Sequence, residues 1–139
     1  MKQATTFWLV FMLMFALSLH AQAEEEKPAD AGPKVIYHPM DEPMIINLVS
    51  PKHPRYVQLG MTFLVDSEET VNAIELHMPV IRNDVGEIIS QMSVKSMQEP
   101  GVRKLVRAQV LNRVNEILDE RAGLRKAVQD IYFDKFVVQ

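Results

Sequence analysis

A run of ten residues, 56–65, alternates between two kinds of side chain at every step. One side of the run holds only large apolar residues: Val57, Leu59, Met61, Phe63 and Val65. The other side holds a mixed set: Tyr56, Gln58, Gly60, Thr62 and Leu64. A period of two is typical of a β-strand buried on one face. Because a slip of one residue would turn the whole apolar set toward water, the chain has to build a sheet with one covered face.

Two shorter apolar runs precede this strand, and a longer one ends the chain. Residues 35–38 form a strand candidate closed by Pro39, and residues 44–49 form another. The short link 50–54 favours antiparallel pairing of the second run with the long strand. The last run, 128–138, has apolar residues on both sides, which predicts a central, well-covered strand. Its two sides hold Ile131, Phe133 and Val137, and Tyr132, Phe136 and Val138.

After the long strand the apolar period becomes that of a helix. Ser67 is a good N-cap, Pro79 predicts the start of a second helix, and Gly123 is a stop signal. Helices are expected at residues 67–78, 79–92 and 101–120, with residues 93–100 irregular. The order βββ-ααα-β predicts an α+β domain in which helices cover one face of an antiparallel or mixed sheet.

The first 23 residues decide the compartment. Phe7–Leu19 is an apolar run of 13 residues, and Ala21 and Ala23 then have the A-x-A spacing of a signal-peptidase site, with Glu24 as the new N-terminus. A spanning helix needs about 20 apolar residues, and 13 residues reach only about 20 Å. The length favours a cleaved signal peptide over residues 1–23, with a short membrane anchor as the alternative, and either one exports the rest of the chain.

The segment 24–34 is charged, rich in Pro and Gly and without large apolar residues, so we interpret it as a flexible linker. The folded domain is then expected at 35–139. Without the first 23 residues the chain has 14 basic and 18 acidic side chains, a net charge of −4. Such an acidic chain argues against nucleic acid as a partner.

The residues that usually carry chemistry do not form a pattern. The chain has no cysteine, which excludes disulfides, thiol nucleophiles and Cys-ligated metals. Beyond the first 23 residues, His38, His53 and His77 have no second histidine at ligand spacing, and no nucleotide-binding or hydrolase motif occurs. We therefore predict a protein that is not an enzyme, with no catalytic residue, cofactor or metal.

Charge divides the exported chain into two parts. Residues 24–99 hold 13 acidic and 6 basic side chains, a net −7, whereas residues 100–126 hold 3 acidic and 7 basic ones, a net +4. Within the third helix, Arg103 and Arg107 fall inside the apolar arc, where an arginine has to reach the rim, pair with a carboxylate or face a partner. One hypothesis is an interface with another copy or a partner, and the alternative is a solvated surface with ordinary ion pairs.

Five segments together resemble the FliL family of flagellar basal-body-associated proteins. They are Ile45-Ile46-Asn47-Leu48, Arg55-Tyr56-Val57-Gln58, Met78-Pro79-Val80-Ile81-Arg82, Val106-Arg107 with Val110 and Asn115, and the ending from Val128 to Gln139. The resemblance extends from about Tyr37 to Gln139, and the terminal Y-F-x-x-F-V-V-Q is its most specific part. It implies a domain similar to the stomatin/prohibitin type, able to form rings. It also implies a periplasmic, inner-membrane-associated accessory that acts beside the flagellar stator units in swimming, swarming and chemotactic control of rotation.

Three features depart from the family pattern. The apolar run is shorter than the family's usual membrane helix and precedes an A-x-A site, the glycine that starts the third helix is displaced by one residue at Gly101, and Asp134 replaces a common threonine. We therefore expect a FliL-like motor accessory that is either anchored or released into the periplasm. The competing hypothesis is a periplasmic adaptor or ligand-binding module that keeps the fold without the flagellum.

Overall fold

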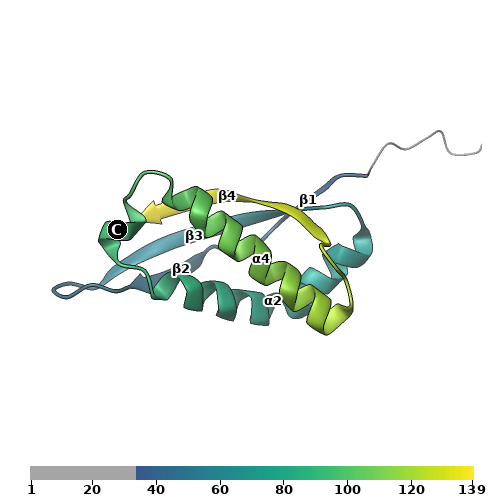
Figure 1. Ribbon diagram of the computed structural model, residues 1–139, viewed down its shortest axis with the longest axis horizontal. Coiled ribbons are helices and arrows are strands. Elements are labelled where there is room, and N and C mark those ends of the chain that lie inside the picture. Colours follow the sequence, from purple (N-terminus) through teal and green to yellow (C-terminus); the bar gives the residue numbers. More distant parts are fainter. Residues whose placement is uncertain (1–33) are drawn as a thin grey trace, which may run out of the picture. The chain divides into compact units, whose positions relative to one another are not determined.

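Strand β3 (Arg55–Val65) is the centre of the sheet in the computed structural model, which describes residues 34–139 (Figure 1). The five apolar residues of the alternating pattern are all completely buried: Val57, Leu59, Met61, Phe63 and Val65. The predicted strand and the facing of its side chains are therefore confirmed.

Strands β1 (Ile36–Pro39) and β2 (Met44–Leu48) follow one another along the same edge of β3. Both are antiparallel to β3, β1 beside its second half and β2 beside its first half. Between them the Met40 N–H still donates to the Met61 carbonyl at 2.8 Å. The two strands are thus one edge strand interrupted at residues 41–43, and the predicted antiparallel pairing of residues 44–48 is confirmed.

Helix α2 (Glu68–Ser90) runs without a break through Pro79, so the prediction of two helices divided there is wrong. Pro79 is exposed, while Ile74 and Ile81 on either side of it are completely buried. A proline inside a helix costs about 3 kcal/mol. Burying each isoleucine contributes about 1.5–3 kcal/mol, so keeping both in the core offsets that cost. The N-cap prediction is confirmed, since the Ser67 hydroxyl accepts from the Thr70 N–H at 3.2 Å.

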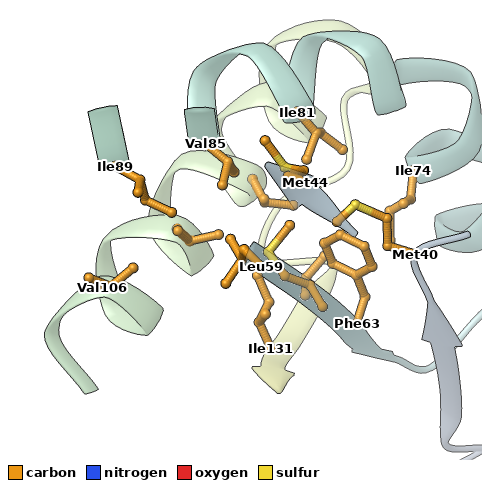
Figure 2. Close-up of a cluster of buried hydrophobic side chains, with 14 of the residues drawn as sticks. Met40, Met44, Leu59, Phe63, Ile74, Ile81, Val85, Ile89, Val106 and Ile131 are labelled. Atoms are coloured by element: carbon orange, nitrogen blue, oxygen red, sulfur yellow. The ribbon is translucent and has the colours of Figure 1, made fainter. Parts of the chain in front are cut away.

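The segment predicted to be irregular contains a short helix, α3 (Val94–Met97), which Ser93 caps. Helix α4 (Val102–Ala122) follows and ends at Gly123, whose φ of 70° is left-handed, as the predicted stop requires. Helices α2 and α4 lie on the same side of the sheet (Figure 1). Figure 2 shows Phe63 of β3 together with Ile81 of α2 and Val106 of α4 in the core between these layers.

Strand β4 (Val128–Val138) pairs with β3 on the edge opposite β1 and β2. The register shifts between Gly60 and Thr62 and again between Leu64 and Val65, with one extra β4 residue each time. These β-bulges change which residues of β4 face the core, and the buried ones are Val128, Ile131 and Phe136. The prediction of a central strand is wrong, because among the described residues β4 pairs only with β3.

The fold is therefore α+β, with an antiparallel four-stranded sheet and helices on one face. The predicted order of three strands, three helices and one strand is confirmed, although the helices divide the chain differently. Among residues 34–139, no helix combines the length and apolar character that crossing a membrane requires.

Candidate functional site

The predicted site residues fall into two groups. The cleavage site at Ala21, Ala23 and Glu24 lies outside the described residues and stays a prediction. The two candidate interface residues, Arg103 and Arg107, lie on α4, whose side chains contact β4 along its outer edge.

Arg103 binds the end of β4. Its Nη2 donates to the Phe136 carbonyl at 3.1 Å, and its guanidinium carbon lies 4.9 Å from the centre of the Phe136 ring. That ring stacks on Phe133, with ring centres 5.5 Å apart. Because a guanidinium over an aromatic face gains a cation–π attraction, the charge of Arg103 has a partner within the chain.

Arg107 lies one turn further along the helix and also meets β4. Its Nη1 is 3.7 Å from the Asp130 carboxylate, and the two side chains are 39% and 29% exposed. A pair as accessible as this contributes at most about 1 kcal/mol. The interface hypothesis started from arginines that need a partner, and both have one in their own chain. Contact of either arginine with a second chain stays a prediction.

Asn115 contacts the same edge and was not assigned a role from the sequence. Its side-chain amide accepts from the Val128 N–H at 3.0 Å and donates to the Val128 carbonyl at 2.9 Å. The amide thus forms the two hydrogen bonds that a neighbouring strand would form. The sequence feature that could have indicated this role is that Asn115, a polar residue, lies beside Val114 and Leu118 on the apolar side of the helix. Asn115 and Arg103 thus bind backbone groups near the two ends of the outer edge of β4, and Arg107 pairs with the Asp130 side chain between them.

An ion-pair cluster joins α2 to α4. The Nε of Arg113 donates to the Asp84 carboxylate at 2.8 Å, and its Nη1 donates to Glu116 at 2.9 Å. Hydrogen bonds from Asn83 and Arg113 lower the pKa of Asp84 below its ordinary value, although burial opposes them. The hydrogen bonds to Glu116 and Asp84 raise the pKa of Arg113. Both partners are therefore ionised at neutral pH, and the cluster links the two helices.

A pocket of 470 Å³ opens where the edge strand is interrupted, between residues 38–42 and α2. Arg82 of α2 holds this crossing in place, because its Nη1 donates to the Glu42 carbonyl at 2.8 Å and contacts the Met40 sulfur at 3.2 Å. Arg82 belongs to one of the segments that carry the family resemblance, and the structure gives it this local role.

The pocket lining combines acidic, basic and apolar side chains. His38 lies 3.9 Å from the Glu75 carboxylate and stacks on the Phe63 ring. The remaining lining consists of Pro39, Met40, Asp41, Glu42, Met78 and Arg82, which includes no Ser, Thr, Cys or Lys nucleophile. Within residues 34–139, no group of three His, Asp or Glu side chains could hold a metal ion.

The sheet face opposite the helices is open and carries exposed apolar side chains. Tyr37, Ile45, Tyr132 and Val137 are 61%, 70%, 40% and 39% exposed, and the two tyrosine rings lie 6.0 Å apart. Such an apolar surface is typical of a region that contacts another protein.

The comparison with known families decides what kind of protein this is. The family model described as flagellar basal body-associated protein FliL matches residues 37–139, which is nearly the whole described domain. The chain belongs to the FliL family. Among curated relatives, "Flagellar protein FliL" of Aquifex aeolicus (strain VF5) is 33% identical over 113 residues, covering 81% of this chain and 67% of that protein. "Flagellar protein LafL" of Vibrio parahaemolyticus serotype O3:K6 (strain RIMD 2210633) is 21% identical over 114 residues, covering 82% of this chain and 66% of that protein. The match thus spans about two thirds of each relative's length.

Proposed function

We propose that this FliL-family protein is a non-enzymatic accessory of the flagellar basal body that acts beside the stator units. In this role it supports flagellar rotation, swimming and the chemotactic control of rotation. The observation that carries the proposal is the family match across residues 37–139, and the two relatives named as flagellar proteins support it.

A tagged copy tests the stator part of the proposal. We expect fluorescent foci at the flagellar base in cells that contain stator units and a loss of these foci in cells without them. Deletion of the gene should reduce swimming. If foci persist in cells without stators, the protein binds the basal body independently of the stator. If the deletion strain swims normally and the tagged copy forms no foci, the protein has no flagellar role.

The proposed organisation places the domain 35–139 in the periplasm, behind a linker at 24–34 and a signal peptide or short inner-membrane anchor at 1–23. Trp8, the only tryptophan, lies in the first segment. Cleavage after Ala23 would make Glu24 the N-terminus and remove all indole fluorescence. The intact mass of protein from its native host distinguishes the cleaved form from a full-length form extracted with membranes.

The proposed assembly is a ring of head-to-tail copies similar to stomatin/prohibitin domains, in which the basic α4 meets the acidic half of a neighbour. We expect Arg107→Glu to reduce oligomer mass or localisation to the flagellar base while the melting temperature stays nearly unchanged, because the Asp130 pair is weak. Arg125→Glu is the control. Arg125 lies beyond the end of α4, is 85% exposed and pairs with Asp119 of the helix. If the Arg107→Glu variant unfolds, Arg107 stabilises the fold of its own chain and the interface hypothesis fails.

The second candidate function is a periplasmic adaptor or ligand-binding module that is not tied to the flagellum. The pocket between residues 38–42 and α2 favours it, because this pocket offers acidic and thioether groups to a small ligand. A deletion strain that swims normally, together with a protein that is absent from the flagellar base, would support this function instead.

A further inference from the structure

The two outer edges of the sheet differ in how they are covered. Side chains of α4 bind outward backbone groups near both ends of β4, Asn115 at Val128 and Arg103 at the Phe136 carbonyl. Along β2, on the opposite edge, Ile45 is 70% exposed and Asn47 is exposed as well. Within residues 34–139, no hydrogen bond reaches the outward side of these two residues.

The hydrogen-bond pattern of β3 fixes which backbone groups of β2 point outward. Tyr56 exchanges both of its backbone hydrogen bonds with Gln139, at 3.0 and 2.9 Å, so its polar groups face β4. Successive residues of a strand turn these groups to opposite sides, so those of Val57 face β2. Val57 is opposite Ile46, whose N–H and carbonyl therefore point inward. It follows that the N–H and carbonyl groups of Ile45 and Asn47 point away from the sheet.

The neighbouring outward positions of this edge, residues 43 and 49, limit what can pair there. Pro43 has no N–H to donate. The Val49 N–H already donates to the Met92 carbonyl at 3.1 Å, and Val49 forms a single bridge with Ser93. As far as residues 34–139 are concerned, the edge therefore offers two complete residues, Ile45 and Asn47, each with a free donor and a free acceptor on its outward side.

We propose that β2 pairs with β2 of a second copy of this chain, antiparallel and across a two-fold axis beside Ile46. In this register Ile45 of each copy is opposite Asn47 of the other. The outward N–H group and carbonyl of each of these four residues then form hydrogen bonds with the residue opposite. If Ile45 were opposite itself, Asn47 would face Pro43, which cannot donate. If Asn47 were opposite itself, Ile45 would face Val49, whose N–H is already used. The edge is thus self-complementary in one register.

The side chains around the edge fit this pairing. Ile45 stands on the open face, and its neighbours across the sheet are Gln58 and then Val137, which is 39% exposed. Pairing of two edges joins the two open faces and partly covers both Ile45 side chains, which stabilises the pair. On the helix side, Gly86 of α2 stands beside Met44, where a Cβ would lie 3.6 Å from the Met44 methyl carbon, so the helix carries no side chain at that point.

This pairing does not rest on the flagellar role, and it uses a surface other than the basic α4 of the proposed ring. The experiments below therefore measure contacts at β2 alone and read out neither swimming nor localisation.

Cysteine pairs test the register directly, because the chain contains no cysteine of its own. The full chain is expressed as Ile45→Cys and Asn47→Cys copies with different tags, alone or together, and intact cells are oxidised. Residues opposite one another in the register have Cα atoms about 5.5 Å apart, which suits a disulfide. Two copies of Ile45→Cys would place their cysteines diagonally and too far apart. Val49→Cys is the matched control. Val49 is exposed, but in this register the Val49 residues of the two copies lie far apart.

We expect the mixed Ile45→Cys and Asn47→Cys cells to give at least about five times more disulfide dimer than either variant alone or the control. Equal yields in all cells would overturn the proposal, as would a preference of Ile45→Cys for itself, which indicates another register. Absence of cross-linking above the Val49→Cys level would exclude pairing at this edge.

A second pair of variants separates backbone pairing from apolar contact. Ile45→Pro removes the outward N–H, and edge strands tolerate such a change. Ile45→Thr keeps the N–H but shortens the apolar side chain. In sedimentation of the full chain, we expect the proline variant to associate at least about ten times more weakly and the threonine variant to remain close to the original. An equal loss in both variants would show that the open face, and not the strand edge, holds the copies together.

Discussion

Replacing Asn115 with alanine removes the amide that closes the edge of β4 while leaving the helix intact. Val128 is only 2% exposed, so its N–H and carbonyl would lose the bonds of 3.0 and 2.9 Å and remain shielded from water. A buried polar group left without a partner costs about 1–3 kcal/mol. Asn115 is itself half-buried, and water entering the vacated space would recover part of this cost. We therefore expect a loss of about 2–4 kcal/mol from the free energy of unfolding, a large share of the roughly 5–15 kcal/mol of a small domain.

Urea denaturation with amide hydrogen exchange measures this loss. With a denaturant slope of about 1.5 kcal/mol per M, the midpoint of Asn115→Ala should fall by roughly 2 M. Exchange at the Val128 amide should accelerate more than exchange in β3, because local opening no longer breaks the bond to Asn115. Asn115→Asp keeps an acceptor for the Val128 N–H but has no donor for its carbonyl, so its stability should be intermediate.

Asn112→Ala is the matched control, since Asn112 is exposed on the same helix one turn earlier. Its free energy of unfolding should stay within about 0.5 kcal/mol of the original. If Asn115→Ala is as stable as this control and the Val128 amide exchanges at its original rate, Asn115 does not close the edge and the reasoning fails.

Three further predictions concern the core, the open face and acid stability. Phe63→Ala, at a completely buried position, should lower the free energy of unfolding by about 3–5 kcal/mol in a denaturant titration, and a smaller change would contradict the packing of Figure 2. A Cβ at Gly60 would overlap with the Asp134 carboxylate, so Gly60→Ala should destabilise the protein, and adding Asp134→Ala should recover most of the loss in a double-mutant cycle. Because the pKa of Asp84 is lowered from 3.8 in the folded state, its contribution is complete above that value and is lost as the pH falls through the folded pKa. The stability difference between the original chain and Asp84→Asn should accordingly shrink between about pH 5 and about pH 3, and a constant difference would show that the carboxylate is not stabilised by folding.

The sequence predicted β3 well because its apolar period is local and uninterrupted. It failed at Pro79, where a local rule about proline competed with burial of Ile74 and Ile81, and burial depends on a sheet that lies elsewhere in the chain. It also failed for β4, because a bulge changes the period of two and is set by pairing with Gly60 and Thr62 of another strand.

The candidate site was less predictable than the fold. A helical wheel places Arg103 and Arg107 correctly inside the apolar arc, but it gives no information about which strand edge lies beside that arc. The roles of Asn115 and Arg82 depend on backbone groups of residues 13 and 40 positions away, respectively, and a wheel or a motif search gives no information about them.

The interruption between β1 and β2 makes this edge strand tolerant of changes in length. Each half has its own hydrogen bonds to β3, so residues added between Asp41 and Glu42 leave the register of both halves unchanged. Relatives can therefore differ in chain length here, and with it in the size of the adjoining pocket, without rebuilding the domain. An epitope inserted at this exposed point should be displayed on a folded protein, provided that the Arg82 bond to the Glu42 carbonyl is kept.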